Sequence, residues 1–184
     1  MHRDLVLRAS TGDHDAFAEL ATDAYARLHR TARLILRRED LASDAVQEAL
    51  TSAWLHIRAV REPDRFDAWL NRLVVRACYR ELRRARRGPI EMQVDAIGGP
   101  GVPDASSVLA DRDQLERAFL RLSVEHRAVL VVHHFLGLPD AEAATVLGVP
   151  MGTYKSRLNR AHLALRAALD ADARVAAIGK ESLA

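Results

Sequence analysis

Few residues in this sequence have both the types and the spacing that chemistry at a site requires. Asp44, Gln47 and Glu48 stand at positions i, i+3 and i+4 and therefore share one face of a predicted helix. Paired carboxylates could serve acid–base catalysis, but no nucleophile, glycine-rich phosphate loop or convergent histidine accompanies them in the sequence. A polar patch that binds a basic partner explains the pattern better than an active site does. An ordinary solvated helix face explains the spacing equally well.

The other candidates for metal or redox chemistry are two histidines and one cysteine. His133 and His134 are adjacent, so they project about 100° apart on a helix and are poorly placed to chelate one metal ion. We expect one to be half-buried and the other solvated. Cys78 lies in a largely apolar run and, as the single cysteine, excludes an internal disulfide. The sequence thus predicts a buried structural thiol in a reducing cytoplasm, and no metal, cofactor or catalytic residue.

A basic helix near the carboxyl end is the most informative feature. Between Pro150 and Arg166 the sequence has four Lys or Arg residues and no Asp or Glu. At about 100° per residue, one face collects the polar residues Lys155, Ser156, Arg157, Asn159 and Arg160. The opposite face is an apolar stripe of Tyr154, Leu158, Ala161 and Leu165. Such a helix suits the major groove of DNA, where Arg and Lys reach base edges and phosphates.

The segment before this helix completes a helix-turn-helix pattern. Pro139-Asp140 is a start signal with Asp140 as the expected N-cap, and Gly148 is the expected stop. A short helix, a turn of about three residues and a longer helix have the proportions of that motif. An ordinary helical hairpin with a solvated basic face is the alternative.

A second basic surface lies on the helix predicted from about Phe66 to Arg86. Within about 120° of arc it carries the arginines Arg72, Arg76, Arg80, Arg83, Arg84 and Arg87, with Trp69 on the same arc. Arginines beside an aromatic ring are typical of a nucleic-acid surface, where phosphates meet guanidinium groups and a base stacks on the ring. The alternative is a surface stripe with Trp69 packed under a neighbouring helix, and the pattern does not decide between the two.

Composition assigns the chain to the all-α class. It has 184 residues, 49% of them hydrophobic, but only 9 Gly and 6 Pro. The formal net charge is +2, while residues 54–87 carry 10 Arg against 4 acids, so local basic patches matter more than the total. The sequence has no apolar signal core and no run of about 18 apolar residues. These features predict a soluble intracellular protein that is not embedded in a membrane.

Glycine and proline divide the chain into parts. Residues 88–110 hold four Gly and three Pro, which predicts a mobile linker between helical domains at 1–87 and 111–170. Residues 171–184 form an alanine-rich tail that we expect to fray.

Helix starts and apolar stripes are also predicted within each domain. In the first domain, helices should begin at Asp13 or Asp15, at Asp40 and at about Phe66, with a break at 62–65. In the second, an apolar stripe is expected at Leu115, Phe119 and Leu122. Ser123 should cap a helix that runs through His133 to Gly137.

Together these motifs resemble the extracytoplasmic-function (ECF) sigma factors of bacterial RNA polymerase, over roughly residues 5–170. The family's Asp-x-x-Gln-Glu motif matches at Asp44, Gln47 and Glu48. Its Trp-Leu-x-Arg motif matches at 69–72, and its Leu-x-x-x-x-Arg-x-Val-Leu segment matches at 122–130. The Gly-Thr-x-Lys-Ser-Arg motif matches at 152–157. In this order and spacing, the motifs are highly specific for the family.

The resemblance implies a sigma factor, which is not an enzyme and takes no cofactor or small-molecule substrate. The first domain would bind core RNA polymerase through Asp44, Gln47 and Glu48. It would also recognise the −10 promoter element as it melts, using Trp69, Arg72, Arg76, Arg80, Arg83 and Arg84. The second domain would recognise the −35 element as duplex, using Gly152, Thr153, Lys155, Ser156, Arg157, Asn159 and Arg160. The linker would enter the polymerase cleft, and an anti-sigma factor, often membrane-bound, is an expected partner.

Some positions depart from the family pattern. Arg76 stands where many members have Asn, so a different −10 preference is expected, and Tyr154 replaces a small β-branched residue. Residues 138–144 lack the Ile that is common in the family. Residues 69–70 contain one Trp where housekeeping sigma factors have a pair, which implies weaker melting of promoter DNA. Two other functions stay open: a one-component helix-turn-helix regulator that acts without polymerase, and an enzyme built around Asp44 and Glu48, for which the sequence gives no support.

Overall fold

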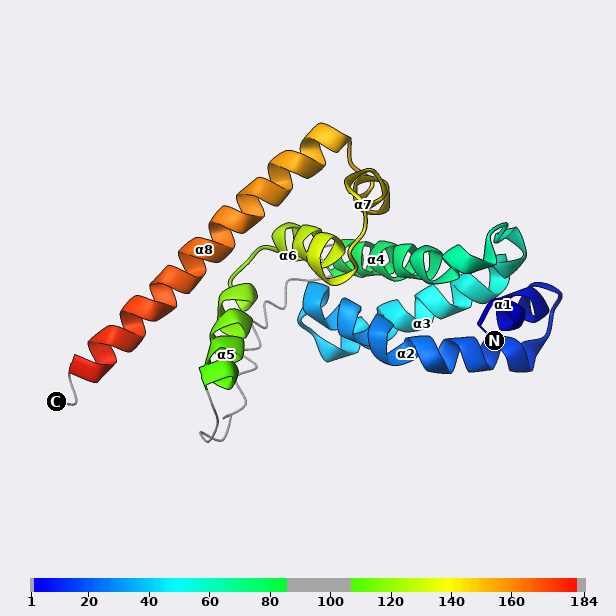
Figure 1. The fold of residues 1–184 in the computed structure, drawn as a ribbon, viewed down its shortest axis with the longest axis horizontal. Helices are drawn as coiled ribbons and strands as arrows, with labels where there is room; N and C mark the ends of the chain where they lie inside the picture. Colours follow the sequence, from blue (N-terminus) through cyan, green and yellow to red (C-terminus); the bar gives the residue numbers. More distant parts are fainter. Residues whose placement is uncertain (1, 86–106, 182–184) are drawn as a thin grey trace.

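The computed structural model describes residues 2–85 and 107–181, and every regular element in these two ranges is a helix. The first range contains α1 (His2–Ser10), α2 (His14–Leu36), α3 (Glu39–His56) and α4 (Phe66–Ala85), with short 3₁₀ turns at Ile57–Ala59 (η1) and Pro63–Arg65 (η2). In Figure 1, α2, α3 and α4 lie side by side, and α1 packs at one end of α2. The all-α prediction is confirmed.

Local signals explain where the helices of the first domain begin and end. The Asp13 carboxylate accepts a hydrogen bond from the Ala16 N–H at 3.0 Å, which caps α2 as predicted. Arg37 ends α2 in the left-handed region at φ 64°. Helix α3 begins at Glu39, one residue before the predicted Asp40, and gives way to η1 at Ile57. The predicted break at 62–65 is therefore the end of a longer irregular connection.

The second range contains α5 (Ser107–Leu120), α6 (Val124–Leu130), a π-helical turn η3 (Val131–Phe135), α7 (Asp140–Leu147) and α8 (Met151–Glu181). Ser123 caps α6 as predicted, because its hydroxyl accepts from the His126 N–H at 3.2 Å. The single helix predicted to continue to Gly137 is wrong in detail. After α6 the chain widens into η3, where the Leu136 N–H donates to the Val131 carbonyl.

Several predicted boundaries need correction. Residues 107–110, assigned to the linker, belong to α5, while 88–106 lie outside the described residues. Residues 171–181, predicted to fray, continue α8. Pro139, not Asp140, is the N-cap residue of α7. The stripe predicted on α5 fails at Leu115, which is 47% exposed, because Ala118 takes the buried position instead.

The two domains pack against each other through arginines that bind backbone carbonyls. Arg127, 4% exposed, donates from Nε to the Ile35 carbonyl at 2.9 Å and from Nη1 to the Leu122 carbonyl at 2.5 Å. In the opposite direction, Arg37 of the first domain donates to the Leu120 carbonyl of the second. Carbonyl groups near the carboxyl ends of α2 and α5 need such partners, because the last turn of a helix leaves its acceptors unsatisfied. These contacts fix α6 against the end of α2.

Cys78 and the membrane prediction can be compared with the fold directly. Cys78 is fully buried in α4, as predicted, and burial raises the pKa of its thiol to about 12. None of the helices in the two described ranges has the length and apolar character that crossing a membrane requires.

Candidate nucleic-acid interface

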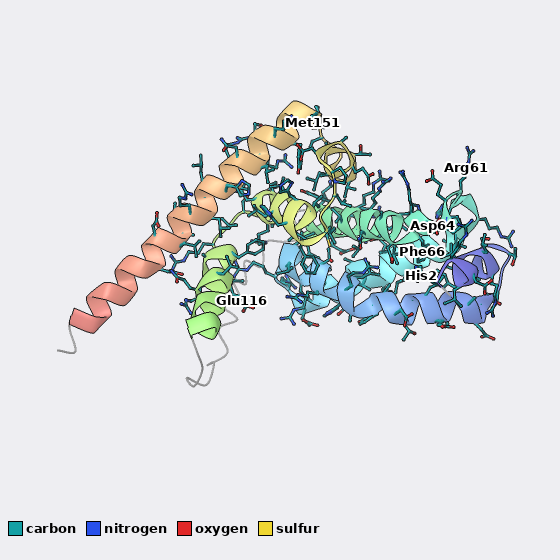
Figure 2. All side chains as sticks on the ribbon, in the orientation of Figure 1. His2, Arg61, Asp64, Phe66, Glu116 and Met151 are labelled. Carbon is teal, nitrogen blue, oxygen red and sulfur yellow. The ribbon has the colours of Figure 1, made fainter. Side chains whose placement is uncertain are left out.

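Helices α7 and α8 form the predicted helix-turn-helix. Gly148 ends α7 in the left-handed region at φ 66°, a conformation that glycine adopts without strain. The Tyr154 side chain is completely buried, and its hydroxyl lies 2.9 Å from His133 Nδ1. This departure from the family pattern thus anchors α8 to η3 beneath it. Figure 2 shows Met151, the first residue of α8, at the top of the view, where α8 follows α7.

The outer face of α8 presents most of the residues predicted for DNA recognition. Five of them are exposed: Gly152, Lys155, Ser156, Asn159 and Arg160. The first acid along α8 is Asp170, so the positive end of the helix dipole and the basic side chains act in the same direction. Arg160 Nε donates to the Ser156 carbonyl at 3.3 Å, which lays this side chain along its own helix. The exposed face of α8 can accept phosphates and base edges.

Arg157 and Thr153 lie differently from the other predicted residues. Both are only partly exposed. Arg157 turns toward Tyr79 on α4. Burial raises the pKa of Tyr79, and the Arg157 guanidinium lowers it by a smaller amount, so the pKa of Tyr79 stays above its ordinary value. The structure therefore does not bring Arg157 onto the exposed face, in contrast to the prediction. The sequence could not show this, because Tyr79 is 78 positions away.

The arginine stripe is present on α4, but part of its charge is neutralised. Arg72 pairs with Glu142 of α7 at 2.9 Å, and Arg80 pairs with Glu48 of α3 at 2.6 Å. Arg84 lies 2.5 Å from Glu81 and 3.5 Å from Glu48. By contrast, Arg76 and Arg83 are exposed and form no ion pair within the described residues. Arg87 lies outside them. The arginines of the stripe thus pair with Glu142 of α7, Glu48 of α3 and Glu81 of α4 itself.

Trp69 is partly buried at the edge of this stripe. It packs against the hydrophobic core, and its ring centroid lies 5.8 Å from that of Phe66. This is the packed arrangement left open by the sequence, with part of the side chain still exposed. Any stacking of a base on Trp69 would use that exposed part.

The polar patch on α3 is divided in two. Asp44 and Gln47 are exposed, as a docking patch requires. Glu48 is less exposed and pairs with Arg80 and Arg84. Its carboxylate therefore also serves to attach α3 to α4.

No arrangement suited to catalysis surrounds these carboxylates in the part of the chain that the structure describes. A cavity of about 350 Å³ is lined by Ala21, Thr22, Tyr25 and Leu50, and one of about 660 Å³ lies along α8. Neither is lined by Asp44 or Glu48. Among residues 2–85 and 107–181, no group of three or more His, Cys, Asp or Glu could hold a metal ion. The neighbours that Glu48 does have are arginines, which suits an ion pair rather than acid–base chemistry.

Two comparisons with known sequences identify the same pair of domains. Residues 6–88 match the family Sigma-70 region 2, and residues 112–165 match Sigma-70, region 4. The ECF RNA polymerase sigma factor SigM of Mycobacterium tuberculosis is 36% identical over 162 residues, covering 88% of this chain and 81% of SigM.

Solved structures give the same result for the fold. The structure of CnrH in complex with the cytosolic domain of CnrY is 28% identical with a TM-score of 0.61, and covers 93% of this chain and 98% of CnrH. The sequence of CnrH comes from Cupriavidus metallidurans. The Bartonella quintana sigma factor RpoE, solved with the anti-sigma factor NepR, is 24% identical with a TM-score of 0.63. It covers 85% of this chain and 98% of RpoE, and shows the shared fold.

Proposed function

Because the chain belongs to the extracytoplasmic-function (ECF) sigma factors of bacterial RNA polymerase, we propose a division of promoter recognition between its two halves. A sigma factor binds core polymerase and directs it to promoters. We assign core binding and −10 recognition to residues 1–87 and −35 recognition to residues 111–170, with 88–110 as the connection. The matches at 6–88 and 112–165 support these bounds.

Recognition of the −35 element is assigned to the exposed face of α8. The observation that carries this assignment is the group Lys155, Ser156, Asn159 and Arg160, which is exposed, carries two cations and has no acid among its neighbours in the sequence. Major-groove recognition needs such side chains at the start of a helix that projects from its domain. Gly152 and Thr153 lie at the amino end of α8, where backbone N–H groups can bind a phosphate. Arg157 joins this set only if it leaves Tyr79.

Recognition of the −10 element is assigned to α4. Arg76 and Arg83 are exposed and pair with no acid of the described residues, so they are the strongest candidates for phosphate contacts. Arg72, Arg80 and Arg84 share their charge with glutamates, and they contribute less unless those ion pairs open. Trp69 supplies the aromatic edge beside them.

Core polymerase binding is assigned to the exposed part of the α3 patch. Asp44 and Gln47 lie exposed on the surface, and a carboxylate there suits a basic partner surface while repelling DNA. Glu48 has a double role in this proposal, because it also holds Arg80 and Arg84 in place.

A protein inhibitor and a cytoplasmic location complete the proposal. CnrH, 28% identical to this chain, is known in complex with the cytosolic domain of another protein, CnrY. We infer that an anti-sigma factor of similar kind restrains this chain, and that the chain acts in the cytoplasm, where polymerase and promoter DNA are found. It acts as the promoter-recognition subunit of RNA polymerase and not as an enzyme.

Transcription in vitro tests the proposal. Purified chain added to core polymerase should start transcription from a small set of sites on genomic DNA, and a mixture lacking either component should not. A one-component regulator would instead bind an operator stably without polymerase and would not confer promoter choice on the core enzyme. Full transcription by the Lys155→Ala and Arg160→Ala variants would contradict the assignment of α8 to the −35 element.

A further inference from the structure

Three histidines of the second domain gather where η3 meets α8. His134 Nε2 and His162 Nε2 are 2.8 Å apart, while the centroids of their rings are 5.1 Å apart. The two nitrogens thus lie between the rings and point at each other, which is the geometry of a hydrogen bond between two imidazoles. His133 meets His134 edge-on at 4.6 Å, and its Nδ1 faces the Tyr154 hydroxyl at 2.9 Å and Asp140 Oδ1 at 3.7 Å.

The space between the Nε2 atoms of His134 and His162 can hold one proton but not two. When one Nε2 is protonated it donates to the other, and the pair is stable with zero or one positive charge. If both Nε2 atoms are protonated, two N–H donors face each other with no acceptor between them, and two cations repel at short range. A second proton on this contact must therefore separate the two rings.

Burial and the two neighbouring histidines make protonation of His134 harder. Burial lowers the pKa of His134, and His133 and His162 lower it further. The carboxylate of Asp140, which belongs to α7, faces His133 and Tyr154. From α2, Arg30 lies over the Phe135 ring at 5.3 Å, and it is another cation.

The other helices packed against the pair direct their charges elsewhere. From α6, Arg127 is committed to backbone carbonyls. From α5, Arg117 and Arg121 face Asp172 near the other end of the described part of α8. The charges that act on His134 are thus those of the other two histidines.

We propose that His134 and His162 form a proton-operated clasp, which holds η3 against α8 at neutral pH and opens in mild acid. A histidine whose pKa is lower in the folded than in the unfolded state stabilises the fold above its unfolded value of about 6.5, and that stability is lost as the pH falls. His162 lies two residues after Arg160, so release of the clasp removes one of the contacts that hold the helix with the proposed −35 face, while Tyr154 remains buried. The effect on DNA rests on that proposed function; the effect on the fold does not.

Histidine titration in the full chain tests the clasp directly. The ring signals of the eight histidines can be followed by NMR from pH 8 to pH 5, with those of the pair assigned from His134→Gln and His162→Gln. Both positions are exposed, so these variants should fold. We expect the His134 signal to titrate below the ordinary histidine value, because burial and the neighbouring histidines lower its pKa. In His162→Gln the pKa of His134 should be lowered less, because one of the groups that lowers it is removed.

Thermal unfolding gives a second measure. Between pH 7.5 and pH 5.5 the Tm of the natural chain should fall by about 2–4 °C more than that of His134→Gln. His56→Gln, at the exposed end of α3, is the matched control and should behave as the natural chain. An ordinary titration of His134 in the natural chain, or an equal fall in Tm for all three proteins, would overturn the proposal.

Two further measurements separate the alternatives. If Zn²⁺ or Ni²⁺ at pH 7.5 raised the Tm of the natural chain and not that of His134→Gln, the pair would be a metal site and the proton clasp would be wrong. Binding of a −35 duplex by holoenzyme should weaken from pH 7.5 to pH 5.5 more with the natural chain than with His134→Gln. If holoenzyme bound no −35 duplex at any pH while His134 kept its lowered pKa, the −35 assignment would be refuted and the clasp would stand.

Discussion

The Arg72 guanidinium on α4 donates to the Glu142 carboxylate on α7 at 2.9 Å, so an arginine proposed to contact the −10 element is bound by the helix-turn-helix domain. Arg157 of the recognition helix likewise faces Tyr79 on α4. From −35 to −10 is about 25 base pairs, or about 85 Å of duplex at about 3.4 Å per base pair. Because α4 and α7 are in contact, this arrangement cannot reach both elements at once. The domains must separate when the protein binds a promoter.

Charge reversal at Glu142 should favour this separation. In Glu142→Lys the new cation repels Arg72. Loss of the part-exposed ion pair destabilises the arrangement in which the two domains are in contact by up to about 1 kcal/mol. We expect a larger radius of gyration by small-angle X-ray scattering, with unchanged helix content. Glu62→Lys, which disrupts an exposed pair with Arg65 inside the first domain, is the matched control. Equal radii for the two variants would show that the Arg72–Glu142 contact does not hold the domains together.

The buried thiol of Cys78 should make stability depend on pH in the alkaline range. Burial raises the pKa of this thiol to about 12, whereas its ordinary value, which we take for the unfolded chain, is 9.0. A group with a raised folded pKa contributes stability that is complete below the unfolded value and is lost as the pH rises toward the folded value. Unfolding free energy should therefore decline between about pH 9 and pH 12, and less steeply in Cys78→Ala. In the native protein at pH 8, a thiol reagent should react with Cys78 only on unfolding.

The two carboxylates of the α3 patch should respond differently to charge reversal. Asp44→Lys changes an exposed residue and should weaken binding to core polymerase without lowering the Tm. Glu48→Lys places a cation beside Arg80 and Arg84 and should lower the Tm by about 2–4 °C for each kcal/mol of stability that it removes. Pull-down with core enzyme and thermal unfolding measure the two effects. Full core affinity of Asp44→Lys would reduce the patch to a solvated helix face.

Local sequence signals predicted the helices well and the contacts between distant elements poorly. The cap at Asp13, the cap at Ser123 and the left-handed Gly148 depend on neighbouring residues, and all three are confirmed. The pairing of Arg72 with Glu142 depends on how two domains meet, and no periodicity within either helix reports it.

The same reason explains why the basic surfaces were only partly predicted. Helical spacing alone places Arg76 and Arg80 on one exposed stripe. Glu48, 32 positions before Arg80, neutralises Arg80 and leaves Arg76 exposed. Spacing predicted one half-buried and one solvated histidine, and His133 is partly buried while His134 is exposed. It could not show that His162 approaches His134 from α8.

Neutralised and exposed arginines on α4 should differ in their effect on salt dependence. Removing one arginine that binds a phosphate should reduce the slope of log affinity against log salt by about 0.9 for duplex and about 0.7 for single strands. The double variant Arg76→Ala/Arg83→Ala should therefore lower the slope by about 1.4–1.8 in a −10 binding assay with holoenzyme. Arg80→Ala/Arg84→Ala, whose charges face Glu48 and Glu81, should lower it less. Equal slopes for the two pairs would show that the ion pairs open on DNA.

Single substitutions along α8 should separate base recognition from general attraction to DNA. Arg160 lies on the proposed recognition face, and Arg166 lies further along the same exposed helix, about 9 Å away at about 1.5 Å per residue. If Arg160 contacts a base edge, Arg160→Ala should cost about 1–3 kcal/mol of −35 duplex binding and relax the preference at one base pair. Arg166→Ala should weaken binding equally for all sequences or leave it unchanged. Affinities for a set of duplexes with single base-pair changes, measured at one salt concentration, decide the matter. An Arg160→Ala profile parallel to that of Arg166→Ala would mean that Arg160 contacts phosphate, and that base recognition lies with Lys155, Ser156 or Asn159.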